Sequence, residues 1–148
     1  MREKRLNIVV TGRNGQIARS LLDFGSPGVN IIPVGRPDLN ISDRQAVLET
    51  LGSIDCDAII HAAAYTNVEA AESSSQEAMQ INCEATAHIA EAADNKSIPL
   101  IYISTDYVFD GMGEHPYRET DATNPLSVYG QSKLAGEKAI QRICSNYA

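Results

Sequence analysis

Tyr129 and Lys133 are the pair of residues in this sequence whose types and spacing best suit acid–base chemistry. Residues four positions apart on a helix share a face, so both side chains can reach one pocket. A free tyrosine has a pKa near ~10 and transfers protons poorly at neutral pH. A nearby ammonium group and the positive end of a helix both stabilise the phenolate, so we expect them to lower the pKa of Tyr129.

Hydroxyl groups that could polarise a substrate carbonyl occur in "STD", residues 104–106, directly after an apolar run. Ser127 is a good helix N-cap residue, and a cap there would place Tyr129 in the first turn, near the positive end of the helix. A Tyr-x-x-x-Lys pair occurs by chance in many helices. Its meaning therefore depends on the elements that position it.

Four apolar runs rich in Ile and Val predict strands, and their lack of alternation is typical of strands buried on both faces. The runs span residues 6–11, 30–34, 57–63 and 99–104. Helix-like stretches follow them at residues 15–25, 42–52, 75–95 and 127–146. This alternation predicts an α/β fold with a doubly wound parallel sheet of Rossmann type, which binds ligands at the carboxyl ends of its strands.

The turn after the first predicted strand could hold a phosphate group. Gly12, Gly15 and Ala18 follow the spacing G-x-x-G-x-x-A between a strand and a helix. Glycines there let the backbone approach a pyrophosphate, and the helix N-terminus offers free N–H groups. Two glycines in a turn can also serve backbone geometry alone. The strand–turn–helix context favours nucleotide binding.

The end of the second predicted strand discriminates between NAD and NADP. An acid there would hold the ribose 2′-hydroxyl, whereas an arginine would accommodate a 2′-phosphate. Gly35 and Arg36 stand where the acid is expected, and Asp38 follows slightly late. Arg36 could instead be a solvated loop residue. The pattern favours NADPH, with NADH as a second cofactor.

The predicted sheet is smaller than expected for this kind of domain. Doubly wound dinucleotide-binding folds carry about six strands, and only four can be counted here, with a fifth expected where the chain stops. We therefore expect residues 1–148 to be an incomplete, N-terminal NAD(P)-binding domain of a longer protein, without its substrate-binding part.

Composition disfavours several classes of function. The net charge of −7 is spread along the chain, which is unlike a nucleic-acid footprint or a protein for anionic membranes. No apolar run approaches the ~20 residues of a membrane span. The three cysteines form no C-x-x-C pair, which predicts reduced thiols and a cytoplasmic location. The three histidines show no metal-site spacing, and His61 is best interpreted as a strand residue with a satisfied ring.

Taken together, these residues resemble the dTDP-4-dehydrorhamnose reductase family, in the extended branch of the short-chain dehydrogenase/reductase superfamily. The segments "GQIA", "AAAYTNVEAAE", "STDYVFDG" and "PYRETDATNPLSVYGQSKLAGEKA" carry the resemblance, which covers residues 6–141. It implies NADPH-dependent reduction of the 4-keto group of dTDP-4-dehydro-L-rhamnose, in nucleotide-sugar and O-antigen biosynthesis. For the longer protein it also allows a homodimer and a Mg²⁺ ion.

The resemblance implies roles for single residues. Tyr129 would protonate the reduced C4 oxygen, and Lys133 would bind the nicotinamide ribose and lower the tyrosine pKa. Thr105 would bind the substrate carbonyl, with Asp106 beside it on the sugar. Besides Gly12 and Arg36, the implied cofactor contacts are Gly15, Gln16 and Ile17 on the pyrophosphate, Asn40 and Ile41 near the adenine, and Ala62, Ala63, Ala64 and Tyr65 along the riboses.

At two positions the sequence departs from the family's usual residue, and at a third the role of the residue is open. Asn40 stands where the family usually has an aspartate, so a hydrogen bond near the adenine would differ in character. Ala18 replaces a frequent third glycine and should still permit close packing. Asn82 matches the superfamily's helix asparagine, whose role here could be to hold a helix bulge or to relay protons.

Two alternative functions stay open. The β subunit of methionine adenosyltransferase resembles the same family and keeps the Tyr–Lys pair, so a non-catalytic regulatory subunit is one of them. Another nucleotide-sugar epimerase or dehydratase of the extended branch is the second. In this family the sugar pocket is made largely by the C-terminal half, so we expect the 148-residue chain to show little or no turnover and weak cofactor binding at most.

Overall fold

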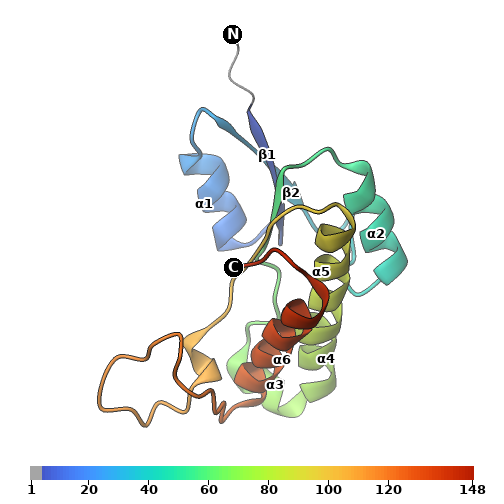
Figure 1. Ribbon diagram of the computed structural model, residues 1–148. Helices are drawn as coiled ribbons and strands as arrows, with labels where there is room; N and C mark the ends of the chain where they lie inside the picture. Colours follow the sequence, from blue (N-terminus) through green and yellow to red (C-terminus); the bar gives the residue numbers. More distant parts are fainter. Residues whose placement is uncertain (1–4) are drawn as a thin grey trace.

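The structure is a computed structural model that describes residues 5–148, and it contains a four-stranded, wholly parallel sheet (Figure 1). The strands are β1 (Leu6–Thr11), β2 (Val29–Val34), β3 (Ala58–His61) and β4 (Leu100–Tyr102). Their order is β2-β1-β3-β4. The predicted α/β, Rossmann-type parallel sheet is confirmed.

The strand order places a topological switch point at β1, because β2 is added on one side of it and β3 on the other. Ligands of doubly wound sheets bind at such a point, outside the carboxyl ends of the strands. The register sets Thr11 beside His61, and His61 beside Tyr102. The last residues of three strands thus form one row along this edge.

Helices cover both faces of the sheet, with α1 on one face and α2, α5 and α6 on the other (Figure 1). The helical segments are α1 (Gln16–Phe24), α2 (Arg44–Ser53), α3 (Val68–Ser73), α4 (Ser75–Met79), η1 (Gln80–Glu84), α5 (Ala85–Asn95), η2 (Asp106–Val108) and α6 (Val128–Ile143). Of these, η1 is a π-helical segment and η2 is a short 3₁₀ helix.

Side-chain caps fix the starts of two predicted helices. The sequence allows Ser42 or Asp43 to cap α2, and the structure selects Asp43, whose carboxylate accepts a 3.0 Å hydrogen bond from Ala46 N. Ser127 caps α6 as predicted, because its hydroxyl accepts a 3.0 Å hydrogen bond from Gly130 N. Tyr129 therefore lies in the first turn of α6.

The prediction of one continuous helix over residues 75–95 is wrong in detail. The π-helical segment η1 interrupts it between α4 and α5, and the short helix α3 before it was not predicted. A π-helical turn inserts one residue into the helix and often marks a functional site. Asn82 lies within η1 and is 1% exposed.

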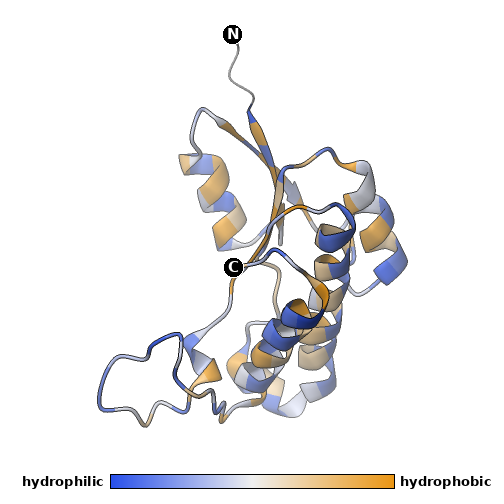
Figure 2. Ribbon diagram, viewed as in Figure 1, coloured by the Kyte–Doolittle hydropathy of each residue, from blue (hydrophilic) through white to orange (hydrophobic). Residues whose placement is uncertain are grey.

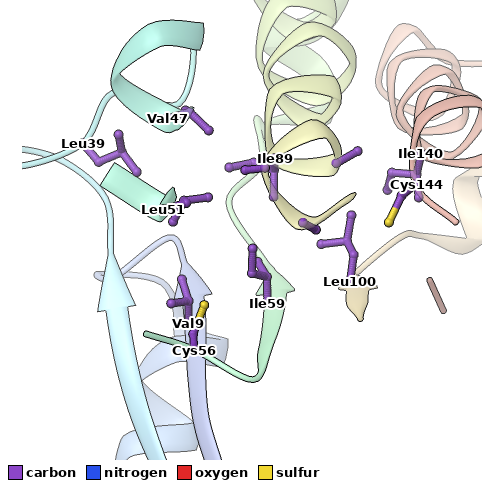
Figure 3. Close-up of a cluster of buried hydrophobic side chains, with 13 residues drawn as sticks. Val9, Leu39, Val47, Leu51, Cys56, Ile59, Ile89, Leu100, Ile140 and Cys144 are labelled. Carbon is purple, nitrogen blue, oxygen red and sulfur yellow. The ribbon is translucent and has the colours of Figure 1, made fainter. Parts of the chain in front are cut away.

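The main core lies between the sheet and the helices α2, α5 and α6 (Figure 3). Val9 and Ile59 extend from the strands toward Leu51 and Ile89, and each of these side chains is fully buried. Small alanines of α5 are buried as well, which lets this helix approach the sheet closely. Strands are largely apolar, whereas the long loop at 109–127 is mostly hydrophilic or neutral (Figure 2).

Residues 146–148 run beside β4, where the sequence predicts that a fifth strand begins. Leu100 N donates to Asn146 O at 3.0 Å, and Tyr102 N donates to Ala148 O at 2.9 Å. Within residues 5–148, no helix has both the length and the apolar composition that a membrane crossing requires. All three cysteines are free, and Cys83 is only partly buried.

Candidate functional site

A cleft of about 710 Å³ opens at the carboxyl ends of β1, β2 and β3, at the switch point of the sheet. Its walls are the loops that follow these three strands. Most of the predicted cofactor residues line it, namely Gly12, Gly15, Gln16, Ile17, Arg36, Asn40, Ile41, Ala62, Ala63 and Ala64. Residues predicted from separate segments of the sequence therefore meet around one space.

The glycine turn is shaped for a group that must lie close to the backbone. Gly12 has a φ of +84°, and a Cβ atom there would lie 3.1 Å from Ala63 N. Any other residue would be strained and would crowd the opposite wall. Gly15 is the N-cap of α1 and gives its first turn no side-chain hydrogen bond, which leaves amide groups available for an anion. This cradle fits the pyrophosphate of a dinucleotide.

Charged residues gather beside the end of β2. Arg36 lines the cleft as predicted, and so does Arg13, which the sequence analysis missed. The Arg13 guanidinium forms an ion pair with Asp38, while Arg13 N donates to Val34 O at 3.1 Å. A basic residue inside a G-x-x-G turn is the sequence signal that could have found it, because that turn lies beside β2.

A buried hydrogen-bond chain supports the alanine loop, which consists of the three alanines at residues 62–64 that follow β3. Thr11 Oγ1 accepts bonds from Ala62 N at 3.2 Å and Ala63 N at 3.1 Å, and it lies 2.7 Å from His61 Nδ1. On the other side, His61 Nε2 lies 2.9 Å from Thr86 Oγ1, which donates to Asn82 O. Because the Thr86 hydroxyl already donates, it accepts from His61, and His61 Nδ1 in turn accepts from Thr11.

His61 is therefore a neutral, fully satisfied residue, as the sequence predicts. Burial, followed by the positive charge of Lys133, lowers the pKa of His61 to about 3. The ring stacks on Tyr102 at a centroid distance of 5.5 Å. Its neutral state lets it connect Thr11 of β1 to Thr86 of α5 without burying a further charge.

Asn82 links the loop after β3 to α6. Its side-chain oxygen accepts from Tyr65 N at 2.8 Å, and its nitrogen donates to Tyr65 O at 3.0 Å and to Ser132 Oγ at 2.9 Å. Ser132 then donates to Tyr129 O at 2.7 Å. Of the two roles left open for Asn82, the geometry supports the first, because its side chain joins the bulge to both segments.

Lys133 is buried although it carries an ammonium group. It is 2% exposed, its Nζ donates to Ile103 O at 2.6 Å, and Nζ lies 4.0 Å from the centroid of the Tyr102 ring. Burial lowers the pKa of Lys133 to about 8, and the Glu137 carboxylate opposes this change. Lys133 therefore stays mainly protonated at neutral pH and titrates in a range useful for catalysis.

Tyr129 is half-buried at the start of α6. Its ring packs edge-on against Tyr107, at a centroid distance of 5.6 Å. Gly130 permits this approach, because a Cβ atom there would collide with Tyr107 O. Gly136 does the same farther along α6, where a Cβ atom would collide with Asn82 O. The position of Tyr129 thus depends on two close contacts of α6.

Thr105 and Asp106 follow β4 at the start of η2. Thr105 Oγ1 accepts from Tyr107 N at 3.2 Å and thereby caps η2, and it donates to Asp106 Oδ1 at 3.3 Å. Asp106 and Tyr107 line a second, smaller cavity of about 330 Å³ together with Ser127. The single proton of the Thr105 hydroxyl is thus directed at Asp106, and the hydroxyl must turn before it can donate to another acceptor.

The remaining predicted cofactor residues, Tyr65, Tyr129 and Lys133, lie outside the lining of the large cleft. Tyr65 and Tyr129 are joined to each other through Asn82 and Ser132, and Lys133 lies over Tyr102. No cluster of three or more His, Cys, Asp or Glu residues suited to a metal ion occurs within residues 5–148. The Mg²⁺ ion and the homodimer implied for a longer protein stay predictions.

Comparison with known proteins identifies a matching family and several relatives that are named as dTDP-4-dehydrorhamnose reductases. A family model described as RmlD substrate binding domain matches residues 6–148. The chain is 43% identical, over 142 residues, to the dTDP-4-dehydrorhamnose reductase of Sinorhizobium fredii strain NBRC 101917 / NGR234, covering 96% of this chain and 48% of that protein. It is also 43% identical to the Escherichia coli K12 enzyme of the same name, covering 96% of this chain and 49% of that protein.

A solved structure agrees with the fold. The crystal structure of dTDP-4-dehydrorhamnose reductase from Bacillus anthracis str. Ames in complex with NADP superposes with a TM-score of 0.93. The two sequences are 34% identical, and the match covers 97% of this chain and 51% of that one. The chain thus spans about half the length of the curated relatives that it matches.

Proposed function

The chain belongs to the RmlD substrate binding domain family, and from this premise we propose that it is the cofactor-binding half of an NADPH-dependent dTDP-4-dehydrorhamnose reductase. The proposed reaction reduces the 4-keto group of dTDP-4-dehydro-L-rhamnose to the alcohol of dTDP-L-rhamnose. One observation supports this most strongly. A glycine-built cleft at the switch point of the sheet is connected, through buried hydrogen bonds, to a helix that carries Tyr129 and Lys133.

The glycine turn would hold the cofactor by its pyrophosphate. Gly12 and Gly15 keep the backbone free of side chains, and the first turn of α1 directs N–H groups toward the anion. Asn40 and Ile41 would face the adenine, and the alanine loop would lie along the riboses. Bound NADPH would supply the hydride that reduces C4 of the sugar.

Selection of NADPH over NADH would come from the two arginines beside β2. Arg36 and Arg13 both line the cleft, and either guanidinium could pair with a 2′-phosphate. Asp38 holds Arg13 in place through their ion pair. NADH would lose these charge-assisted contacts, so we expect it to bind more weakly.

Tyr129 would donate the proton that the reduced C4 oxygen requires. The phenolate that it becomes would be stabilised by the Lys133 ammonium and by the N-terminal end of α6, which begins at Ser127. The Thr105 hydroxyl would donate a hydrogen bond to the substrate carbonyl, and Asp106 would contact the sugar. Tyr107 and the Ile103 carbonyl would hold Tyr129 and Lys133 in place.

A turnover assay on the complete protein, of which we propose that this chain is the N-terminal half, tests the function. dTDP-4-dehydro-L-rhamnose and NADPH are mixed with the protein, and loss of nicotinamide absorbance is followed while the sugar product is identified. Stoichiometric formation of dTDP-L-rhamnose supports the proposal. NADPH binding without turnover would overturn it in favour of a regulatory subunit, and a different sugar product in favour of another enzyme of the extended branch.

A further inference from the structure

Glu137 stands on the same face of α6 as the proposed acid–base pair, four residues beyond Lys133 and eight beyond Tyr129. Its side chain is half-buried. The Ser104 hydroxyl, in the segment that leaves β4, donates a hydrogen bond to the Glu137 carboxylate. A carboxylate on the buried side of the helix is thus fixed from the neighbouring strand end.

Lys133 needs a compensating charge, because its immediate contacts are neutral. The ammonium group meets the Ile103 carbonyl and the face of the Tyr102 ring. A buried ammonium is costly unless an opposite charge acts on it, since each neutral contact replaces only part of its hydration.

The charged and titratable groups that face Lys133 come from each element packed around it. From β3 there is His61, which is neutral, and from β4 there is the phenol of Tyr102, whose pKa burial raises further. From η1 there is the thiol of Cys83, which lies near Tyr102 and has a pKa raised by burial. On α6 itself there are Tyr129 and Glu137.

Among the titratable groups of residues 5–148 that face Lys133, Glu137 is the single carboxylate. It raises the pKa of Lys133 against the larger effect of burial, which alone would lower that pKa below about 8. Three observations therefore indicate that the Glu137 carboxylate stabilises the charged form of Lys133. They are the spacing of the two residues on α6, the hydrogen bond from Ser104 and the burial of Lys133.

We propose that Glu137, held by Ser104, is a positioning residue that keeps Lys133 protonated next to Tyr129. The electrostatic relationship between Glu137 and Lys133 belongs to the chain itself, whereas its consequence for catalysis rests on the proposed function. In that reaction, a neutral Lys133 would no longer stabilise the phenolate of Tyr129. Glu137 would thereby set the upper pH limit of turnover without touching the substrate.

A purely structural role for Glu137 makes a different prediction. The bond from Ser104 ties the strand end to α6, and a glutamine could accept the same bond through its amide oxygen. Glu137→Gln therefore removes the charge and retains the tether, whereas Ser104→Ala retains the charge and removes the tether. The two variants separate charge from geometry.

The test is a direct NMR titration of Lys133 in the 148-residue chain, which contains only four lysines. The Cε and Nζ signals of Lys133 are followed with pH in the wild type, in Glu137→Gln and in Glu137→Asp. We expect Glu137→Gln to lower the Lys133 pKa so that the ratio of charged to neutral amine falls about tenfold at a fixed pH. Glu137→Asp should restore most of that ratio.

Ser104→Ala should lower the same ratio by a smaller factor, about twofold to threefold, because the carboxylate stays but is no longer held. Glu49→Gln removes a carboxylate from α2 and should leave the Lys133 titration unchanged. An unchanged Lys133 titration in Glu137→Gln would overturn the proposal. If that variant does not fold, an unchanged Lys133 titration in Ser104→Ala would overturn the proposal equally.

The complete protein adds a catalytic readout. There, Glu137→Gln should move the alkaline limb of the kcat profile to lower pH by about one unit, with little change in NADPH affinity. A shifted Lys133 titration in a protein without turnover would leave the electrostatic inference intact and refute the proposed function. A shifted titration with an unmoved kcat profile would overturn the catalytic part of the inference.

Discussion

The large cleft, which we propose holds the cofactor, and the segment after β4 differ in how they are built. The glycine turn and the alanine loop bring backbone and small side chains into the cleft, and larger side chains such as Arg13 and Arg36 complete its lining. The segment after β4 places its functional groups through side-chain contacts between distant residues, such as Ser104 with Glu137. The cleft therefore depends on local conformation, whereas the acid–base region depends on how α6 packs.

The loop at 109–127, which follows η2, is also held by side-chain contacts. It is mostly exposed, and its carboxylate Asp110 accepts hydrogen bonds from Met112 N, Tyr117 and Asn124. These bonds hold the pKa of Asp110 below its usual value. The loop is thus ordered by its own side chains, beside the small cavity lined by Asp106 and Tyr107. The large cleft is lined by the loops after three different strands, whereas the smaller cavity is lined by the segment after β4 and the start of α6.

The largest effect that we expect on stability comes from a substitution in the acid–base region. Gly130→Ala should lower the free energy of unfolding by about 3 kcal/mol, because its Cβ atom would collide with the Tyr107 backbone and force α6 away from η2. Urea unfolding monitored by circular dichroism measures this. Gly52→Ala is the matched control, since Gly52 lies in α2 with open space around it and should gain up to about 1 kcal/mol. Equal stability of the two variants would contradict the packing argument.

Lowering the pH should weaken the buried hydrogen-bond chain through His61, which links the cleft to the helices behind it. The pKa of His61 is about 3 in the folded state and 6.5 in the unfolded chain, so its stabilising effect is complete above pH 6.5 and is lost as pH falls. Each pH unit below 6.5 costs about 1.4 kcal/mol, so we expect His61 to cost about 2 kcal/mol at pH 5. Unfolding free energies at pH 7 and pH 5 measure the change.

His61→Asn should remove most of this pH dependence, whereas His115→Gln, in the exposed loop, should leave it as in the wild type. The same slope in His61→Asn and the wild type would show that other groups cause the loss of stability.

A substitution in the glycine turn should weaken NADPH binding to the proposed cofactor cleft without disturbing α6. Gly12→Ala should weaken NADPH binding about thirtyfold, because a positive φ strains alanine and its Cβ atom would crowd Ala63. Isothermal titration measures the affinity. Gly28→Ala, which has open space, should bind as the wild type does. Undiminished affinity in Gly12→Ala would place the cofactor elsewhere.

The smallest effect that we expect concerns the preference of the cleft for NADPH over NADH. Arg36→Ala should reduce the preference for NADPH over NADH about fivefold, mainly by weakening NADPH binding, because Arg13 would remain to contact the 2′-phosphate. Affinities for both cofactors measure this. A preference that disappears only in Arg13→Ala would assign the selection to the turn residue instead.

The sequence was most informative where local spacing decides the structure. Ile and Val runs predicted all four strands, and Ser127 and Gly12 were placed correctly because caps and positive-φ turns depend on neighbouring residues. The α3 helix was missed because six residues give no helical periodicity. The π-helical segment was predicted only as one of two roles for Asn82, because Asn82 is fixed by Tyr65 and Ser132, whose proximity depends on tertiary packing.

The same limit applies to the candidate site. Tyr129 and Lys133 could be predicted to share a helix face, since that depends only on their spacing. The contact of Glu137 with Ser104 could not, because it requires the register of α6 against β4. Strands β3 and β4 are also shorter than their apolar runs, so the residues beyond them leave the sheet and form the walls of the site.

The central claim is that Tyr129 supplies the proton in a site organised by Lys133. Single-turnover reduction of dTDP-4-dehydro-L-rhamnose by the Tyr129→Phe variant of the complete protein tests it most directly, with NADPH affinity measured on the same sample. We expect the rate of the chemical step to fall by about 10²- to 10⁴-fold while the NADPH affinity stays within about twofold of the wild type. A chemical step as fast as that of the wild type would contradict the claim.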